Sequence, residues 1–197
     1  MLNHSWDDFY RATKDSPSWP LVARAAAFAP RGADGGCALD LGAGAGRDTR
    51  YLLGQGFAVT AVDGQQASMA LLAGLPQERL RAVQSSFEDF TFEPATYDLI
   101  SAQYALPFMP PAQFFPVFAR IKTALVPGGV FAGQFFGVHD EWNTPDTTMT
   151  FLTRAQAEDL LRDLETVELT EEDADSGTAV GASKHWHVYH ILARKPA

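Results

Sequence analysis

The sequence has little of several features that would place it in a more specialised class. It contains one cysteine, Cys37, in 197 residues, so no disulfide can form within the chain. Lysine and arginine number 15 against 24 aspartates and glutamates, which gives a formal net charge of −9. Because binding to phosphates needs a clustered excess of basic side chains, this balance argues against a general nucleic-acid binder. It favours a small-molecule substrate.

Long apolar runs are also missing from the sequence. No window approaches the length of a membrane span, and the first residues have neither a basic region nor the apolar core of a signal peptide. We therefore expect a cytoplasmic protein that makes no use of a membrane. The 46% of hydrophobic residues can form a full core, and the length fits one domain, residues 1–197, better than two.

The chain does contain a regular alternation of strand and helix patterns. Apolar strands are predicted at 37–41, 59–63, 80–84, 97–102 and 130–136, and helical patterns at 47–53, 68–72, 110–125 and 153–161. This alternation predicts a parallel sheet with helices on both faces. Segments 165–170 and 187–193 are joined by a polar loop and predict an antiparallel hairpin at one sheet edge. The first 30 residues predict a helical cap outside a core that spans 37–193. Cys37 opens the first strand and is expected to be a small core residue.

The most specific motif is a glycine loop directly after the first strand. Gly42, Gly44 and Gly46 alternate there, so the backbone can turn sharply and approach a ligand with no Cβ in the way. A helix follows from Arg47, and its free N–H groups would point at an anionic group held by the loop. Asp63 ends the second strand, where a carboxylate can accept hydrogen bonds from both hydroxyls of a ribose. The pattern predicts a nucleoside-binding site.

Asp40, the three loop glycines, Asp63 and the segment Leu125-Val126-Pro127-Gly128-Gly129 resemble the class I S-adenosylmethionine-dependent methyltransferases. The resemblance covers roughly residues 37–193. It implies an α/β fold, a Rossmann-like three-layer αβα sandwich whose seven-stranded, mostly parallel sheet ends in a C-terminal antiparallel hairpin. Within the family, Gly46-Arg47-Asp48 and the segment 184–190 are loosely similar to a bacterial branch that includes the tellurite and thiopurine methyltransferases. The implied reaction transfers a methyl group from S-adenosyl-L-methionine to a small-molecule acceptor and leaves S-adenosyl-L-homocysteine.

The resemblance also assigns the cofactor site residue by residue. Gly42 and Gly44 would let the loop approach the methionine part of the cofactor, and Asp40 would brace the loop. Asp63 would hold the ribose hydroxyls. The remaining assignments are Gly64 and Gln65 along the adenine or ribose edge, and Gln103, whose backbone carbonyl would meet the amino group of the cofactor.

Two cofactor-site positions are less regular. Family members often carry an acid after the third strand that binds the adenine amino group, and Ser86 stands in its place unless the register shifts to Glu88. We favour Ser86, with Phe87 as an apolar wall, over simple loop packing. Arg47 opposes the helix dipole in the first turn, so we expect a partner for it. That partner is either the cofactor carboxylate or an acidic side chain such as Asp48 or Asp7.

The acceptor pocket is predicted only in outline. Methyl transfer is an in-line displacement that needs alignment and the exclusion of water, but no covalent enzyme nucleophile. Candidates follow the fourth and fifth strands: Tyr104, Phe108, His139 and Trp142. His139 is the one candidate for a general base, the alternative being a plain surface histidine. Tyr10 is a further candidate, because the aromatics Trp6, Phe9, Tyr10 and Trp19 either cover the cofactor or pack between helices.

Other interpretations remain open from the sequence. We expect no metal site from His185, His187 and His190, because in a strand the first two share one face and His190 lies on the other. One alternative function is an NAD(P)-dependent Rossmann oxidoreductase, although Arg47 stands where that fingerprint places its third glycine. A second alternative is a regulatory protein that binds S-adenosylmethionine without catalysis. Either a monomer or a homodimer is compatible with the sequence.

Overall fold

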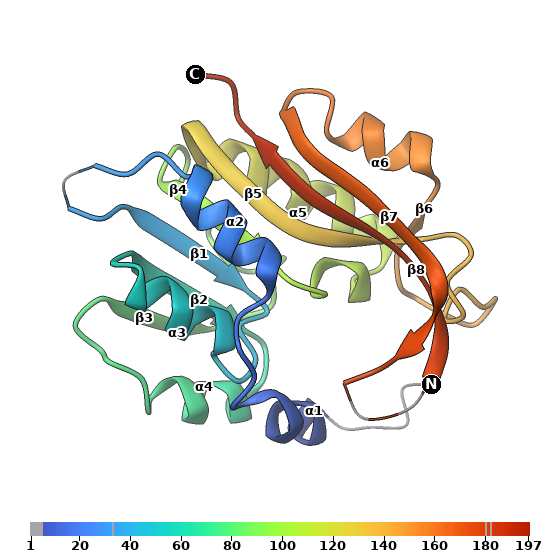
Figure 1. Cartoon of the computed structure of the whole chain (residues 1–197), viewed down its shortest axis with the longest axis horizontal. Coiled ribbons are helices and arrows are strands. Elements are labelled where there is room, and N and C mark those ends of the chain that lie inside the picture. The colour runs from blue at the N-terminus through green and yellow to red at the C-terminus, as the bar shows by residue number, and fades with distance from the viewer. Residues whose placement is uncertain (1–5, 33, 180, 182) are drawn as a thin grey trace.

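The computed structural model describes residues 6–32, 34–179, 181 and 183–197. A twisted sheet forms its middle layer, with helices on both sides (Figure 1). The helices are α1 (Trp6–Thr13), α2 (Pro20–Phe28), α3 (Arg47–Gly54), α4 (Gln66–Leu72), α5 (Pro111–Ala124) and α6 (Arg154–Leu160), with a short 3-10 turn, η1 (Leu106–Phe108). The strands are β1 (Cys37–Leu41), β2 (Ala58–Asp63), β3 (Leu80–Gln84), β4 (Tyr97–Ala102), β5 (Leu125–Gly137), β6 (Phe151–Leu152), β7 (Glu165–Gly177) and β8 (Ser183–Arg194).

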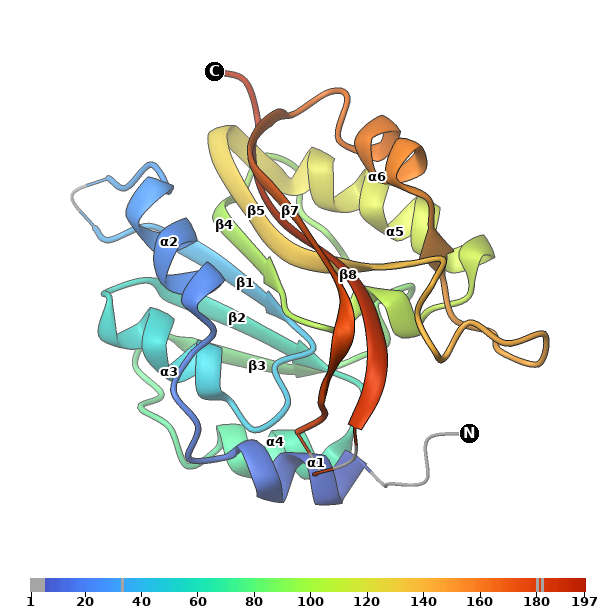
Figure 2. The same ribbon diagram turned by 45° about the vertical axis from the view of Figure 1, so that its right-hand side comes forward.

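The sheet has the order β3-β2-β1-β4-β5-β8-β7, and the two-residue β6 pairs with β5 outside this path. The strands from β3 to β5 are parallel, whereas β8 runs antiparallel to both β5 and β7. The long β7 and β8 curve together along one side of the molecule (Figure 2). This topology confirms the predicted mostly parallel sheet with a C-terminal antiparallel hairpin, to which β6 adds an eighth short strand.

Two apolar cores lie on opposite faces of the sheet. On one face, α2 and α3 pack on β1, β4 and β5 through residues such as Val22, Leu52 and Leu99. On the other face, α5 contributes Phe114 and Phe118, which are fully buried with the aromatic side chains of β5. Burial of one such side chain contributes about 1.5–3 kcal/mol. Among the described residues, no helix combines the length and apolar character needed to span a membrane.

Helix α5 shows how local sequence sets an element. Pro110 and Pro111 occupy its N-cap and first position, where a missing N–H costs nothing. Phe114, Phe118 and Ile121 then recur at helical spacing and face the core. Helix α6 begins with a capping box, in which the Thr153 side chain and the Gln156 side chain each bond the backbone N–H of the other residue.

Three expectations about individual elements were wrong. Cys37 is exposed, because it is the first residue of β1 and burial begins only at the next residue of the strand. β5 begins at Leu125, so Pro127-Gly128-Gly129 lies within the strand instead of before it, at a break in register between the Tyr97–Leu125 and Leu99–Val130 pairs. The hairpin strands extend well beyond the predicted 165–170 and 187–193, because the register continues from the Glu165–Arg194 pair to the Gly177–Ser183 pair.

Candidate active site

The glycine loop lies at the carboxyl end of β1. Gly42, Gly44 and Gly46 all have positive φ angles, of 73°, 54° and 77°, which side chains other than glycine rarely adopt. A Cβ on Gly42 would lie 2.5 Å from the Cβ of Ala105, so the loop passes close to the segment after β4. Hydrogen bonds from Gly42 and Ala43 to the carbonyl of Val62 fix the loop to β2. The sequence motif therefore produces a rigid backbone platform.

Asp63 lies beside this platform and is 6% exposed. Its Oδ2 accepts the N–H of Gly44 at 2.8 Å, and its Oδ1 accepts the N–H of Gln65 at 2.9 Å. The hydroxyl of Tyr10 also donates to Oδ1, at 3.0 Å. Tyr10 is 4% exposed, so helix α1 covers the carboxylate. This contact favours the interpretation of the N-terminal aromatics as a cover over the predicted ribose site.

A second buried carboxylate braces the loop from below. Asp40, in β1, is 2% exposed and accepts a hydrogen bond of 2.5 Å from the hydroxyl of Thr49 in α3. Asp48 lies nearby and accepts the backbone N–H of Trp19 at 2.9 Å. Burial raises the pKa of both carboxyls above their ordinary values, and the charge of Asp48 raises the pKa of Asp40 further. Asp40 therefore connects β1 to α3, the two elements on either side of the glycine loop.

Arg47 points away from the loop. Its Nε donates to the carbonyl of Pro17 at 2.9 Å, and its guanidinium carbon lies 4.5 Å from the centre of the Trp19 ring. In the described part of the chain no ion pair joins Arg47 to Asp48 or Asp7. Burial lowers the pKa of Arg47 and the nearby charge of Asp48 raises it, so this predicted acid is a charged neighbour and not a hydrogen-bond partner. A backbone carbonyl and an aromatic face satisfy the cation instead, and they anchor the segment between α1 and α2.

The predicted adenine side is formed by two loops. Phe87 approaches the platform, because its Cζ would be 3.6 Å from a Cβ on Gly42. Ser86 caps a turn, with its hydroxyl donating to Asp89 at 2.8 Å and accepting the Asp89 N–H. Gly64 faces the same loop, since a Cβ there would lie 3.9 Å from the carbonyl of Ser85. The structure thus brings Gly64 and Phe87 to the same end of the sheet as Asp63.

A buried amide pair sets the chain path after β4. The side chain of Gln103 donates to the carbonyl of Ala132 at 3.0 Å and accepts from Gln134 at 2.9 Å. Gln134 in turn accepts the backbone N–H of Tyr104 at 2.8 Å. Tyr104 has a positive φ of 49°, a strained conformation for a tyrosine. The side chain of Gln103 is thus a positioning group, and only its main chain is left for the predicted cofactor contact.

An aromatic cluster follows β4 and β5, next to the platform. We define it as Trp6, Tyr104, Phe108, Phe136, Trp142 and Trp186. Its ring centres are 5.2 to 6.3 Å apart, which is the range of edge and stacked contacts. Tyr104, Phe108 and Trp142 had been predicted for the acceptor pocket. Phe136 and Trp186 had not, although Trp186 stands out as an aromatic residue that alternates with histidines.

A buried ion pair supports the aromatic cluster. Lys184 and Asp140 form a salt bridge in which both side chains are almost fully buried. The ammonium of Lys184 lies 3.9 Å from the ring centre of Trp142 and 4.0 Å from that of Trp186. Asp140 also accepts the N–H of Trp142 at 3.0 Å. The pair therefore sets the spacing of the two indoles.

His139 is not part of the aromatic cluster. Its Nδ1 is 2.9 Å from Oδ2 of Asp173 in β7, and its ring stacks on His187 in β8. The side chain is mostly exposed. The structure thus separates His139 from the other predicted acceptor residues, and pairs its imidazole with a carboxylate on the face of the hairpin opposite to Trp186.

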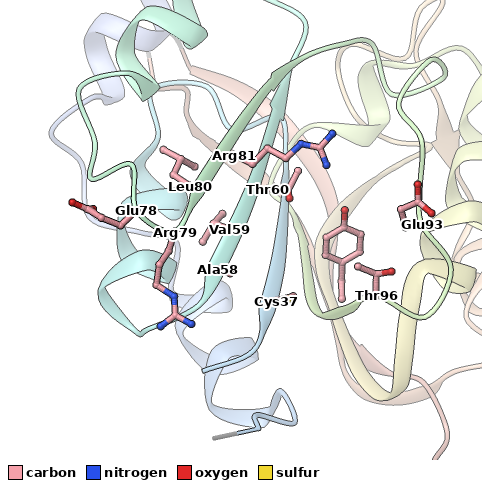
Figure 3. A pocket seen from close by; sticks show the side chains of 11 residues that line it. Cys37, Ala58, Val59, Thr60, Glu78, Arg79, Leu80, Arg81, Glu93 and Thr96 are labelled. Carbon is pink, nitrogen blue, oxygen red and sulfur yellow. The ribbon is translucent and has the colours of Figure 1, made fainter. Parts of the chain in front are cut away.

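Two cavities outside this region help to locate the site. One, of about 360 Å³, lies at the amino ends of β1 to β4, where Thr60 and Arg81 face the segment that carries Glu93 and Thr96 (Figure 3). It is at the end of the sheet opposite to the glycine loop. The other, of about 350 Å³, lies between α1 and α4 and is lined by Tyr10, Ala67 and Leu71 among others. Only the second adjoins the platform.

Comparison with known proteins agrees with this geometry. Residues 38–129 match the family described as Methyltransferase domain. An uncharacterized methyltransferase from Synechocystis sp. is 33% identical over 94 residues, which are 48% of this chain and 44% of that protein. The chain therefore spans less than half the length of this curated relative.

Two solved structures extend the likeness over most of the chain. The 1,6-didemethyltoxoflavin-N1-methyltransferase of Burkholderia thailandensis, with bound 1,6-didemethyltoxoflavin and S-adenosylhomocysteine, has a TM-score of 0.67 at 26% identity, covering 90% of this chain and 77% of its own. TehB from Haemophilus influenzae has a TM-score of 0.76 at 20% identity, covering 97% and 67%. The predicted resemblance to the class I S-adenosylmethionine-dependent methyltransferases is confirmed: residues 38–129 match a methyltransferase domain, and most of the chain has the Rossmann-like fold of the solved methyltransferase.

Proposed function

We propose that the protein transfers the methyl group of S-adenosylmethionine to a small-molecule acceptor. One observation carries the proposal: the glycine platform with Asp63 adjoins the aromatic cluster at the carboxyl ends of the strands, where open α/β sheets bind ligands. The similar Burkholderia enzyme binds S-adenosylhomocysteine and a small molecule together, which supports the same division here.

On the donor side, we assign the cofactor to the residues around the platform. The backbone of Gly42 and Gly44 would hold the methionine part, and Asp63 would accept the ribose hydroxyls once the Tyr10 hydroxyl moves from Oδ1. The other cofactor residues in this proposal are Gly64, Gln65, Ser86 and Phe87 on the adenine side and the backbone of Gln103 near the amino group. Arg47 acts by anchoring Pro17 and Trp19 instead of binding the cofactor.

On the acceptor side, the aromatic cluster supplies an apolar wall. When bound, the cofactor supplies an electrophilic methyl group on a sulfonium. The chain then has to align the acceptor atom with that methyl group and to exclude water. We assign both roles to Tyr104, Phe108 and Trp142, whose rings would surround the acceptor. Tyr104 is an unsuitable base, because burial raises its pKa far above neutral.

The domain organisation, the cellular location and the oligomeric state belong to the same proposal. We take residues 1–197 as one domain, with 1–30 as cap and 37–193 as core, working in a bacterial cytoplasm as a monomer or homodimer. The acidic charge supports a small-molecule acceptor over a nucleic acid.

Calorimetry with S-adenosylhomocysteine and with NADH tests the donor. We expect the first to bind and the second not to; tight binding of NADH alone would favour the oxidoreductase and refute the proposal. Two glycine variants make the test specific. Gly42→Ala should abolish binding, because the Cβ would collide with Ala105 at a positive φ, whereas Gly54→Ala meets nothing within 4 Å and should leave binding unchanged.

The acceptor is tested by screening thiols, phenols, amines and metalloid oxyanions for release of S-adenosylhomocysteine. We expect turnover with at least one class. Binding of the cofactor product without release from any acceptor would support the regulatory alternative instead. Loss of turnover in Trp142→Ala, with the cofactor affinity retained, would assign the aromatic cluster to the acceptor.

A further inference from the structure

A cluster of histidine and carboxylate side chains lies on one face of the β7–β8 hairpin, outside the proposed active site. The register places Asp173 opposite His187 and Asp175 opposite His185. His139, from the segment after β5, joins them through its contact with Asp173. One ligand atom from each of His139, Asp173 and His187 lies within 4.8 Å of the others. Three separate segments therefore bring two imidazoles and a carboxylate together.

The hydrogen bonds of His187 set its tautomer. Its Nδ1 accepts the backbone N–H of His139 at 3.0 Å, so Nδ1 carries a lone pair. Its Nε2 is 2.8 Å from Oε1 of Glu171 and donates to that carboxylate. Glu171 is held in turn by Arg154, at 3.0 Å. A histidine whose far N–H is bound by a carboxylate, with the near nitrogen left basic, is the usual arrangement behind a metal ligand.

The position of His187 is tightly determined by packing. The side chain is almost fully buried, and a Cβ on Gly137 would lie 2.2 Å from its Nδ1, so only a glycine at position 137 leaves room for the ring. The His139 ring stacks on it with the centres 4.6 Å apart. His185 holds Asp173 from the other side, with its Nε2 2.8 Å from Oδ1. Packing and hydrogen bonds thus fix His187 and Asp173, whereas the His139 ring, stacked at 19° to the His187 ring, must turn out of the stack before both imidazoles can direct a lone pair at one ion.

We propose that His139, Asp173 and His187 bind a divalent transition-metal ion of the zinc class. Imidazole nitrogens and a carboxylate oxygen are ligands that Zn²⁺ takes in sites with three protein ligands and one open position. The ion would displace the proton shared by His139 and Asp173. It would also replace the backbone N–H of His139 as the partner of the lone pair on Nδ1 of His187. Strand alternation separates His190 from His185 and His187, whereas the fold brings His139 and Asp173 to His187.

The location of this site suggests what the ion does. It would join the segment after β5 to the hairpin, and the next residue of that segment, Asp140, forms the ion pair with Lys184. Asp140 also accepts the backbone N–H of His187, at 3.2 Å. The ion would therefore link the segment that carries Asp140 to the hairpin, and so support the aromatic cluster from the opposite face of β8.

The test is a titration of the chelator-treated protein with Zn²⁺ alone, followed by calorimetry. We expect one ion per chain and a higher unfolding temperature with Zn²⁺ present. His139→Ala and Asp173→Asn should each weaken binding by at least about 100-fold, because each alters a ligand and the loss of an outer-shell partner alone costs about 10- to 100-fold. His190→Gln is the matched control, because His190 pairs with Glu172 on the other face of the same hairpin. This variant should bind Zn²⁺ as the wild type does.

Co²⁺ provides a second readout that does not depend on heat or stability. We expect visible absorption bands of a tetrahedral Co²⁺ site in the wild type and their loss in His139→Ala, an exposed position where substitution leaves the fold intact. Absence of Zn²⁺ binding would overturn the proposal and leave a network of histidine–carboxylate pairs. Binding that persists in His139→Ala and Asp173→Asn would overturn it equally.

Discussion

The donor side and the acceptor side of the proposed site are built in different ways. On the donor side, residues 40–68 form a continuous stretch, and its contacts run between backbone groups and buried carboxylates, as in Gly44 to Asp63. On the acceptor side, the rings come from five separate segments, and the buried charges of Lys184 and Asp140 serve to space them. The platform therefore depends on the path of one stretch of chain, whereas the acceptor side depends on side chains brought together from separate segments. A different acceptor could be accommodated by ring substitutions that leave the cofactor site unchanged.

The largest effect is expected for Lys184→Met, which tests the acceptor side. It leaves Asp140 as a buried, uncompensated charge, so the free energy of unfolding should fall by about 3–5 kcal/mol, measured by urea denaturation. Adding Asp140→Asn should recover part of this loss. The affinity of the folded variant for S-adenosylhomocysteine should not change if the two sides are as separate as we infer.

Lys122→Met is the matched control for Lys184→Met. Lys122 also pairs with an aspartate, Asp163, at 2.9 Å, but this pair lies at the surface. Its loss should cost less than about 1 kcal/mol. Equal effects of the two substitutions would contradict the buried role of the Lys184–Asp140 pair.

On the donor side, Asp63→Ala should weaken the binding of S-adenosylhomocysteine by about 1–3 kcal/mol, because it removes a charged acceptor for the ribose and releases the Gly44 N–H. Calorimetry measures this directly. Asp98→Ala is the control, since Asp98 also accepts a backbone N–H, that of Cys37 at 2.7 Å, but at the opposite end of the sheet. Unchanged affinity in Asp63→Ala would show that the ribose binds elsewhere.

The difference between the donor and acceptor sides also explains which parts of the site can be predicted from the sequence. The strand, glycine loop, helix and strand-end acid follow one another within about 25 residues, so local backbone preferences indicate the donor side directly. The partner of Arg47 is not local: the guanidinium contacts Pro17 and Trp19, whose position depends on how the N-terminal helices pack. Local backbone propensities therefore cannot predict the contact of Arg47 with Pro17 and Trp19.

The hairpin shows a second limit of the sequence. β7 extends to Gly177 through acidic residues whose composition is typical of a loop. An exposed edge strand lacks the alternation of apolar and polar residues that marks a half-buried strand, so the sequence does not indicate this part of β7. Hydrogen bonding to β8, and not the residue pattern of β7 itself, makes this segment a strand. The same pairing places Trp186 on one face and His187 on the other, which separates the aromatic cluster from the histidine cluster.

The pH dependence of stability tests the role of Asp40, the buried carboxylate that connects β1 to α3. Burial raises its pKa and that of Asp48, so the folded chain keeps protons that the unfolded chain releases. The free energy of unfolding should therefore fall as pH rises from about 4, the ordinary value, through the raised pKa values. Asp40→Asn should flatten this slope, by an amount on the order of 1 kcal/mol between pH 5 and 8, in urea denaturation at each pH.

Asp163 is the matched control for Asp40. The hydrogen bond from Lys122 lowers its pKa, so its contribution is lost as pH falls instead of as pH rises. Asp163→Asn should therefore leave the slope above pH 5 as it is in the wild type. A slope that is equally steep in Asp40→Asn and the wild type would mean that Asp40 is not the proton-binding group.

The smallest effect, on the order of 1 kcal/mol, is expected for Tyr10→Phe, which tests where the cap meets the donor side. The Tyr10 hydroxyl and the Gln65 N–H share Oδ1 of Asp63, so a ribose hydroxyl must displace the phenol to reach that oxygen. Removing the hydroxyl removes this competitor while the ring keeps its packing, so calorimetry should show about 2- to 10-fold tighter binding of S-adenosylhomocysteine. Tyr51→Phe, on α3, controls for the loss of a phenol as such. Weaker binding in Tyr10→Phe would mean instead that the hydroxyl bonds the cofactor, and that α1 belongs to the donor site itself.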